Sequence, residues 1–241
     1  MANRFYQPGE ERGAQVRALF SRISHRYDLL NDLQSFGRHR AWKRTLVDLA
    51  QIRPGERVLD VCCGTGDLSF EMARRGAEVT GVDFTGEMLA VAAKRIPRER
   101  LTGPAPVFVR GDAQALGFPA DSFDVVTVGY GLRNLGDWQK GLGEMWRVAR
   151  PGGRILTLDF GKPRNALWRQ LYFWHLALSV PLVGKIFAGN KEAYGYILES
   201  LKTFPAQEGI AAEMRSLGGE DVAVKTFWSG VMAVNFGRKP W

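Results

Sequence analysis

The chain has 241 residues and is 45% hydrophobic, which is enough for one sizeable core. Its two cysteines, Cys62 and Cys63, are adjacent. This argues against a disulfide framework and favours buried apolar residues over redox or metal roles, so we expect no metal and a reducing cytoplasm.

Residues 1–12 lack the apolar stretch of a signal peptide. The net charge of +8 suits a plain basic surface first, an anionic membrane second and nucleic acid third, since no RNA-binding signature is present.

Residues 13–50 are expected to be largely helical. A helix should begin near His39 and run to about Ala50, ending before Pro54. The segment ahead of it has more polar and aromatic residues than a simple packing helix needs. We interpret residues 1–50 as a helical lid, which either caps the sheet or covers a substrate.

A glycine turn follows the first predicted strand. The apolar run 58–63 ends at Gly64, Thr65 and Gly66, and an amphipathic run follows over residues 68–74. This pattern predicts a buried strand, a tight turn and the start of a helix. Glycines allow a ligand to approach the backbone, and the first N–H groups of the helix point into the turn.

A dinucleotide site fits this turn poorly. The fingerprint G-x-G-x-x-G needs a third glycine, and this chain has Ser69 there. Asp60 and Asp67 would also place negative charge beside a pyrophosphate. A ligand that tolerates two carboxylates is cationic or zwitterionic and has no phosphate. S-adenosylmethionine meets that description, and a tight turn without any ligand is the plainer alternative.

Acids follow two further predicted strands. The strand 78–83 ends in Asp83, about twenty residues after Asp60, where an acid of a βαβ unit hydrogen-bonds ribose hydroxyls. The strand 106–109 is followed by Asp112, whose carboxylate can accept a hydrogen bond from an adenine amine. Because ligands gather at the carboxyl ends of parallel strands, the three acids together favour a nucleoside site.

The remaining elements continue the alternation of strands and helices. Their ranges are a helix over 84–95, with Met88 on its core face and near the ligand, a strand over 122–129, a helix over 138–149, a strand over 154–160, helices over 192–203 and 207–217, and strands over 222–228 and 230–236. The alternation from 57 to 160 predicts a mostly parallel sheet with helices on both faces, and the last two strands predict an antiparallel hairpin.

Residues 164–188 form a long aromatic stretch that breaks this alternation. Arg169, Pro181 and Lys185 interrupt it, so it is not a convincing transmembrane helix. A packing helix of a cap and an apolar pocket for a hydrophobic substrate are equally supported, and contact with a membrane interface less so. We expect one domain with four parts, which are a lid (1–50), a cofactor-binding core (51–160), a helical cap (161–205) and a closing helix and hairpin (206–241).

From about Leu19 onward the sequence resembles the ubiquinone/menaquinone biosynthesis C-methyltransferases of the demethylmenaquinone methyltransferase type. These belong to the class I S-adenosylmethionine-dependent methyltransferases. The general methyltransferase features are residues 60–66 and Asp83, and the more specific stretches are 27–32, 35–37, 39–40, 131–134, Tyr194 and 196–200. The resemblance implies a Rossmann-like α/β fold with a mostly parallel seven-stranded sheet, helices on both faces, a C-terminal antiparallel hairpin and a helical cap.

The resemblance also implies a reaction, the methylation of a ring carbon in a polyprenylated hydroquinone. The acceptor would be demethylmenaquinol or the corresponding benzoquinol, and the alternative is another lipophilic or phenolic molecule. The substrate ring would face Arg133, Asn134 and Tyr194. S-adenosylmethionine would lie against Asp60, Gly64, Thr65, Gly66, Asp83, Met88, Asp112, Ala113 and Gly129.

The catalytic base stays open at this point, because arginine holds its proton too firmly to serve. A water, Tyr194, His25 or His175 are the alternatives. We expect a cytoplasmic enzyme associated with the inner face of the membrane, with no nucleic-acid partner, and a homodimer stays open. The rival is a basic membrane-binding or RNA-binding module without activity, which the acids Asp60, Asp83 and Asp112 argue against.

Overall fold

The computed structural model describes residues 32, 35, 37–187, 200–201 and 203–241, and only the backbone of 179–187. The expected lid up to residue 31 lies outside the described residues. So do most of the helix expected over 192–203 and the whole of Tyr194, together with His25.

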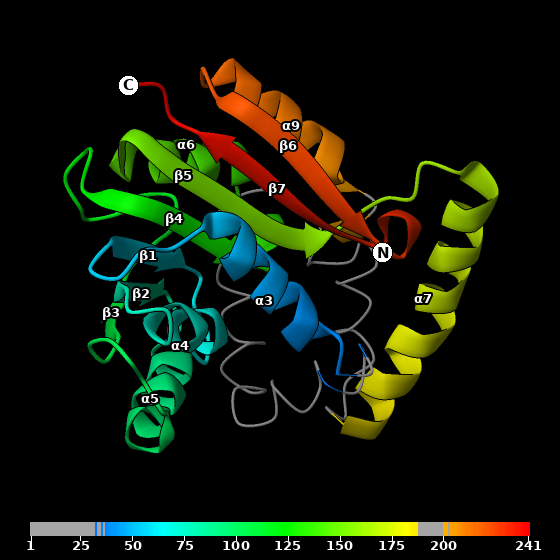
Figure 1. Ribbon diagram of the computed structural model, residues 1–241. Helices are drawn as coiled ribbons and strands as arrows, with labels where there is room; N and C mark the ends of the chain where they lie inside the picture. Colours follow the sequence, from blue (N-terminus) through cyan, green and yellow to red (C-terminus); the bar gives the residue numbers. More distant parts are fainter. Residues whose placement is uncertain (1–31, 33–34, 36, 188–199, 202) are drawn as a thin grey trace.

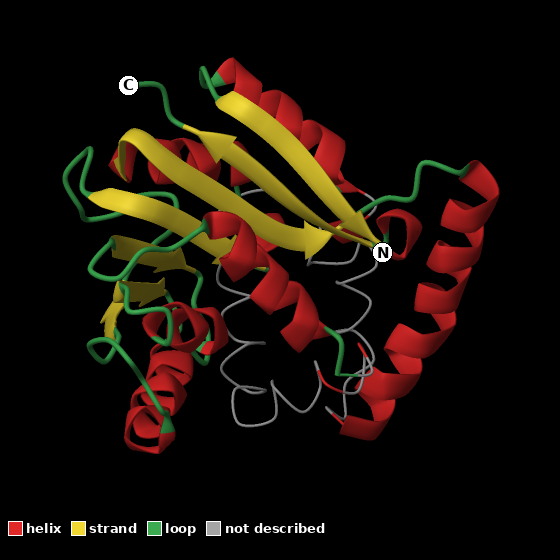
Figure 2. Ribbon diagram, in the orientation of Figure 1, coloured by secondary structure: helices red, strands yellow, loops and turns green. Residues whose placement is uncertain are grey.

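A seven-stranded sheet forms the centre of the molecule (Figures 1 and 2). The strands are β1 (Arg57–Val61), β2 (Glu78–Asp83), β3 (Val107–Arg110), β4 (Phe123–Gly129), β5 (Ala149–Phe160), β6 (Glu220–Phe227) and β7 (Met232–Arg238). Their order is β3-β2-β1-β4-β5-β7-β6, and only the pairs that involve β7 are antiparallel. The predicted sheet, with its C-terminal antiparallel hairpin, is therefore confirmed.

Helices cover both faces of this sheet. They are α3 (His39–Ala50), α4 (Asp67–Ala73), α5 (Gly86–Arg95), α6 (Trp138–Val148), α7 (Ala166–Phe187) and α9 (Ala206–Ser216). Neighbouring strand residues point to opposite faces, so each buried strand feeds two hydrophobic cores. Val125 of β4 packs in the core under α3 and α4, whereas the next residue, Val126, packs in the core under α6 and α9.

A polar cluster opens α3, the helix that the sequence predicted over the same residues. The carboxylate of Asp32 accepts hydrogen bonds from His39 Nε2 at 2.8 Å and from Arg40 Nη2 at 2.7 Å. The Ser35 hydroxyl accepts the backbone N–H of His39 at 3.2 Å and so satisfies one orphan donor of the helix. These four residues come from stretches that carry the family resemblance, and here they hold the start of α3.

Several predicted boundaries differ from the observed ones, most of them by one or two residues, and two differences have a clear physical cause. β1 ends at Val61, because Cys62 adopts a left-handed backbone with φ of 55°, so the cysteine pair belongs to the turn rather than to the strand. β5 begins at Ala149 rather than at Arg154. Ala149 already pairs with Phe123 of β4, and a register shift in that pairing accommodates the Pro-Gly-Gly run that was expected to separate helix from strand.

Candidate active site

A pocket lies at the carboxyl ends of β1, β2, β3 and β4, the edge where open α/β sheets bind ligands. β1 and β4 are neighbours in the sheet although they are far apart in sequence, so the segments that follow them meet at this edge. The structure brings several predicted site residues together in the pocket lining, namely Gly64, Asp83, Met88, Asp112, Ala113, Gly129 and Asn134.

The glycine turn after β1 closes tightly. Cys62, Gly64 and Gly66 all have positive φ, at 55°, 54° and 86°. The N–H of Gly66 donates to the carbonyl of Cys63 at 2.9 Å, and the N–H of Gly64 donates to Asp83 Oδ2 at 2.9 Å. The turn is therefore tied to the end of β2, and its backbone faces the pocket without side chains at Gly64.

Two carboxylates give the pocket its charge. Asp83 is buried and accepts the N–H of Thr85 at 2.8 Å in addition to that of Gly64. Burial raises the pKa of Asp83, although these two N–H groups oppose the shift. Asp112 is exposed and accepts the N–H of Gln114 at 2.8 Å. Among the described residues that line the pocket there is no lysine, arginine or histidine, so this part of the site suits a cationic or zwitterionic ligand without phosphate.

Asp60 lies behind the turn and outside the pocket lining. Its carboxylate is fully enclosed and accepts hydrogen bonds from Ser69 Oγ at 2.6 Å and from Thr127 Oγ1 at 3.2 Å. Burial raises the pKa of Asp60 to about 6, against the effect of these two hydroxyls. Asp60 thus links β1 to α4 and to β4 by hydrogen bonds, and these bonds hold the strand and the helix on either side of the turn in place.

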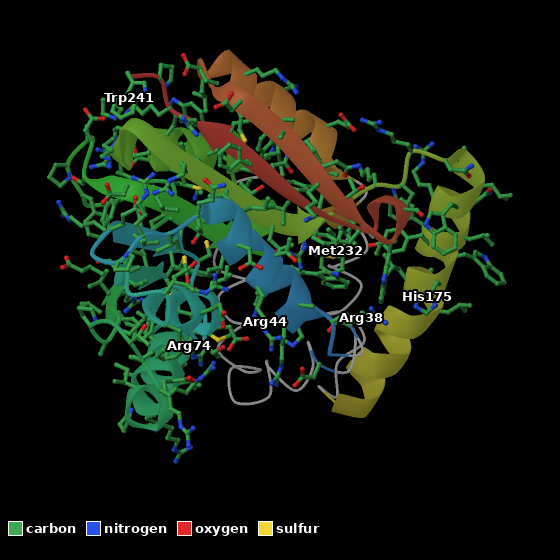
Figure 3. All side chains as sticks on the ribbon, in the orientation of Figure 1. Arg38, Arg44, Arg74, His175, Met232 and Trp241 are labelled. Atoms are coloured by element: carbon green, nitrogen blue, oxygen red, sulfur yellow. The ribbon has the colours of Figure 1, made fainter. Side chains whose placement is uncertain are left out.

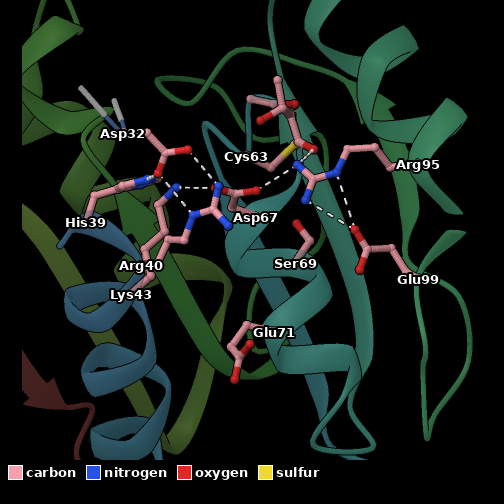
Figure 4. Close-up of polar contacts among 12 residues, drawn as sticks. Asp32, His39, Arg40, Lys43, Cys63, Asp67, Ser69, Glu71, Arg95 and Glu99 are labelled. Atoms are coloured by element: carbon pink, nitrogen blue, oxygen red, sulfur yellow. Dashed lines mark hydrogen bonds and ion pairs between the residues drawn. The ribbon is translucent and has the colours of Figure 1, made fainter. Parts of the chain in front are cut away.

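Asp67 is the first residue of α4 and is held by two cations (Figure 4). Lys43 Nζ of α3 lies 2.7 Å from its Oδ2, and Arg95 Nη1 of α5 lies 2.6 Å from its Oδ1. Burial alone would raise the pKa of Asp67, but the charges of Lys43 and Arg95 hold it well below its usual range. Because Lys43 and Arg95 compensate its charge, Asp67 would not repel a phosphate strongly. The carboxylates that would repel one are Asp83 and Asp112.

The loop after β4 approaches the glycine turn closely. A Cβ on Gly131 would lie 2.4 Å from the Cβ of Cys62, so only glycine fits there. Tyr130 has a φ of 61°, and its carbonyl accepts hydrogen bonds from Arg133 Nη1 at 2.7 Å and from Asn134 Nδ2 at 3.0 Å. The side chains of Arg133 and Asn134, both expected at the substrate ring, are thereby held by the carbonyl of Tyr130.

Arg133 forms a buried ion pair with Asp159 at the end of β5. The Arg133 Nη1 to Asp159 Oδ1 distance is 3.1 Å, and the two side chains are 7% and 3% exposed. The guanidinium also lies 4.8 Å from the centre of the Phe160 ring. Burial raises the pKa of Asp159, and the charge of Arg133 opposes that rise. The pair keeps a cation beside the pocket without leaving its charge uncompensated.

Some expected site residues do not line the pocket. Thr65 and Gly66 belong to the turn, and Arg133 lies beside the lining rather than in it. Sequence reasoning missed Asp159, although a signal was available, since it lies one residue before the end of β5, much as Asp83 lies at the end of β2. It also missed other lining residues, namely Cys62, Val82, Phe84, Thr85, Gly111, Gln114, Tyr130, Gly131, Leu135 and Gly136.

The described residues include no group of three or more His, Cys, Asp or Glu side chains placed to hold a metal ion. None of the helices in the described part of the chain combines the length and the apolar character that a membrane span requires.

Comparison with known proteins gives close relatives along nearly the whole chain. The chain is 38% identical over 238 residues to the demethylmenaquinone methyltransferase of Bacillus cytotoxicus, covering 97% of this chain and 98% of that protein. It is 40% identical over 235 residues to the ubiquinone/menaquinone biosynthesis C-methyltransferase UbiE of Methylococcus capsulatus, covering 96% and 94%. Its fold is similar to that of the Synechocystis magnesium protoporphyrin IX methyltransferase solved with bound SAH, at a TM-score of 0.68 and 18% identity, covering 94% of this chain and 99% of that one.

A possible histamine N-methyltransferase from Thermotoga maritima shares the fold as well, at a TM-score of 0.63 and 18% identity, covering 93% of this chain and 99% of the other. The predicted class I methyltransferase fold is therefore confirmed. The model of the ubiE/COQ5 methyltransferase family matches residues 8–239. Together with the identities above, this match shows that the chain belongs to the ubiE/COQ5 methyltransferase family.

Proposed function

We propose that this chain catalyses the S-adenosylmethionine-dependent C-methylation of a polyprenylated hydroquinone in respiratory quinone biosynthesis. The acceptor is demethylmenaquinol or the corresponding benzoquinol, in line with the names of the relatives. The observation that carries the proposal is the meeting of a glycine turn, two carboxylates and the loop 129–135 in one pocket of a methyltransferase-family chain.

The pocket fits the cofactor by its donor set. Asp83 offers a buried carboxylate for ribose hydroxyls, and Asp112 offers an exposed one for the adenine amine. Gly64 leaves open space where a Cβ would lie, and Gly131 lets the loop after β4 approach Cys62. When bound there, S-adenosylmethionine supplies an electrophilic methyl group on a sulfonium. Met88 and Ala113 provide the apolar walls.

The chain's own residues act on the acceptor ring. Ring carbon is a poor nucleophile unless a hydroxyl of the hydroquinone loses its proton and pushes electron density onto the neighbouring carbon. Arg133 can stabilise the developing phenolate, because its guanidinium is a cation with several N–H donors. Asn134, which lines the pocket, can orient the same oxygen. We assign Tyr194 to the same ring on the resemblance alone.

We further propose that the enzyme works at the inner face of the membrane, with α7 as the contact. Leu167, Leu171, Trp174 and Leu178 recur at helical spacing and are 69%, 52%, 70% and 62% exposed. His175 of the same helix is exposed as well (Figure 3), and Arg164, just before the helix, has an 85% exposed side chain. An apolar stripe beside an exposed arginine, which also pairs with Glu208, on a chain of net charge +8 suits an anionic lipid surface.

Sedimentation with vesicles tests the membrane contact. Trp174→Ser should weaken binding to vesicles rich in anionic lipid, while Val107→Ser, at a 61% exposed position on β3, should not. Equal loss in both variants, or in neither, would contradict the assignment of α7.

A panel of acceptors tests the reaction itself. The purified chain is incubated with methyl-labelled S-adenosylmethionine and, in turn, with reduced naphthoquinols, benzoquinols and simple phenols. We expect label in at least one polyprenylated quinol class. If only the simple phenols become labelled, the lipophilic or phenolic alternative is favoured. If no acceptor becomes labelled, the proposed reaction is contradicted.

A further inference from the structure

Lys43 is a buried lysine on the inner face of α3, and no step of the proposed reaction uses it. The residue is 9% exposed and lies three and four residues before Leu46 and Val47, which pack in the core beneath α3. A charged lysine is almost never buried to this extent unless its ammonium group has partners. The contacts of Lys43 therefore indicate what the charge does at this position.

One contact joins Lys43 to the glycine turn (Figure 4). Its Nζ donates to Asp67 Oδ2 at 2.7 Å, and Asp67 directly follows Gly66. At the other oxygen of the same carboxylate, Arg95 Nη1 donates to Asp67 Oδ1 at 2.6 Å, and it also donates to the carbonyl of Thr65 at 2.9 Å. The turn is therefore held by one cation from α3 and by one from α5.

A second contact joins Lys43 to the loop after β4. Its Nζ lies 5.9 Å from the centre of the Tyr130 ring, within the range of a cation–π interaction. Tyr130 lines the pocket, and its carbonyl holds the side chains of Arg133 and Asn134. A shift of Tyr130 would therefore move both side chains that are expected at the acceptor ring.

We propose that Lys43 is a positioning residue, which fixes the cofactor side of the pocket relative to the acceptor side. The glycine turn belongs to the cofactor side and the loop after β4 to the acceptor side, and one ammonium group contacts both. Methyl transfer needs the sulfonium and the acceptor carbon in line, and a misplacement of about 1 Å can cost roughly a hundredfold in rate. This inference rests on methyl transfer as the proposed function, whichever acceptor is used.

Lys43→Met removes the charge and keeps an unbranched apolar side chain. The turnover number kcat is measured at saturating S-adenosylmethionine with the acceptor that becomes labelled, per cofactor-binding site counted by calorimetry, so unfolded protein does not contribute. We expect kcat to fall about tenfold or more, because the two sides of the pocket lose their link. The Kd of S-adenosylmethionine should change less than about threefold, because Arg95 still holds Asp67 and Thr65.

Asp48→Asn is the matched control. Asp48 also lies on α3, and it pairs at 2.8 Å with Arg75, which follows α4. Its side chain is 59% exposed, and neither partner lines the pocket, so this variant should keep wild-type kcat. The assignment is overturned if Lys43→Met keeps wild-type kcat, or if both variants lose kcat equally. It is also overturned if the loss of kcat in Lys43→Met is matched by an equal loss of cofactor affinity, since Lys43 would then act on the cofactor side alone.

Hydrogen exchange tests the link without any acceptor. The N–H of Asn134 donates to the carbonyl of Gly131 at 2.9 Å within the loop after β4. This amide should exchange at least about threefold faster in Lys43→Met than in the wild type or in Asp48→Asn. If the wild-type chain methylates no acceptor, the proposed function fails, and the exchange still decides the role of Lys43. Faster exchange then supports the link, and unchanged exchange overturns it.

Discussion

Replacing Arg133 by alanine removes the partner of a buried carboxylate. The Asp159 side chain is 3% exposed and lies 3.1 Å from the guanidinium. Removing one member of a buried pair costs about 3–5 kcal/mol, because the other charge stays in a place without water. A chain of this size loses roughly 2–4 °C of Tm per kcal/mol. We therefore expect Arg133→Ala to lower Tm by about 6–20 °C, in addition to its effect on methyl transfer.

Thermal unfolding of single and double variants isolates this effect. Asp159→Asn in the Arg133→Ala background removes the stranded charge and should recover at least half of the lost Tm. Methyl transfer should stay absent in both variants at a temperature where both are folded, since neither has the guanidinium, while S-adenosylmethionine still binds. The reasoning is refuted if Arg133→Ala melts with the wild type, or if the double variant melts no higher than the single one.

Three further experiments test other parts of the molecule. Asp83→Asn replaces a carboxylate that accepts the N–H groups of Gly64 and Thr85 by an amide, one end of which can only donate. S-adenosylmethionine binding, measured by calorimetry, should weaken about 10- to 100-fold. Asp60, whose folded pKa of about 6 is raised, favours folding most at low pH, so wild type should lose roughly 2 kcal/mol relative to Asp60→Asn as pH rises from about 4 to about 8 in denaturant titrations. Gly131→Ala should cost about 1–3 kcal/mol through contact with Cys62, whereas Gly143→Ala, with open space inside α6, should stabilise by up to about 1 kcal/mol. An unchanged affinity, an identical pH slope or equal effects of the two glycine changes would contradict the respective assignment.

Periodicity and turn chemistry predicted most of the fold. The strand 78–83 and the helix 39–50 were expected at their observed bounds. Acids that end parallel strands were expected at one edge, and Asp83 and Asp112 do meet there. These features are local or follow from sheet topology, so a sequence contains them directly.

The electrostatics of the site were not predictable in the same way. Sequence reasoning treated Asp60 and Asp67 as free charges beside the ligand, but Asp60 lies behind the turn and Asp67 is compensated by Lys43 and Arg95. Lys43 comes from α3 and Arg95 from the end of α5, so no spacing along the chain reveals that they meet. Arg133 was expected to face the substrate. It follows β4 whereas Asp159 belongs to the neighbouring strand β5, so their pairing could not be read from the sequence either.

The position of the transferred methyl group tests the central proposal most directly. A polyprenylated hydroquinone is incubated with S-adenosylmethionine carrying a labelled methyl group, and the product is analysed by mass spectrometry and NMR. We predict one labelled methyl on a ring carbon and both ring oxygens free. A labelled methyl on oxygen, or an acceptor recovered without label, would contradict the proposed function.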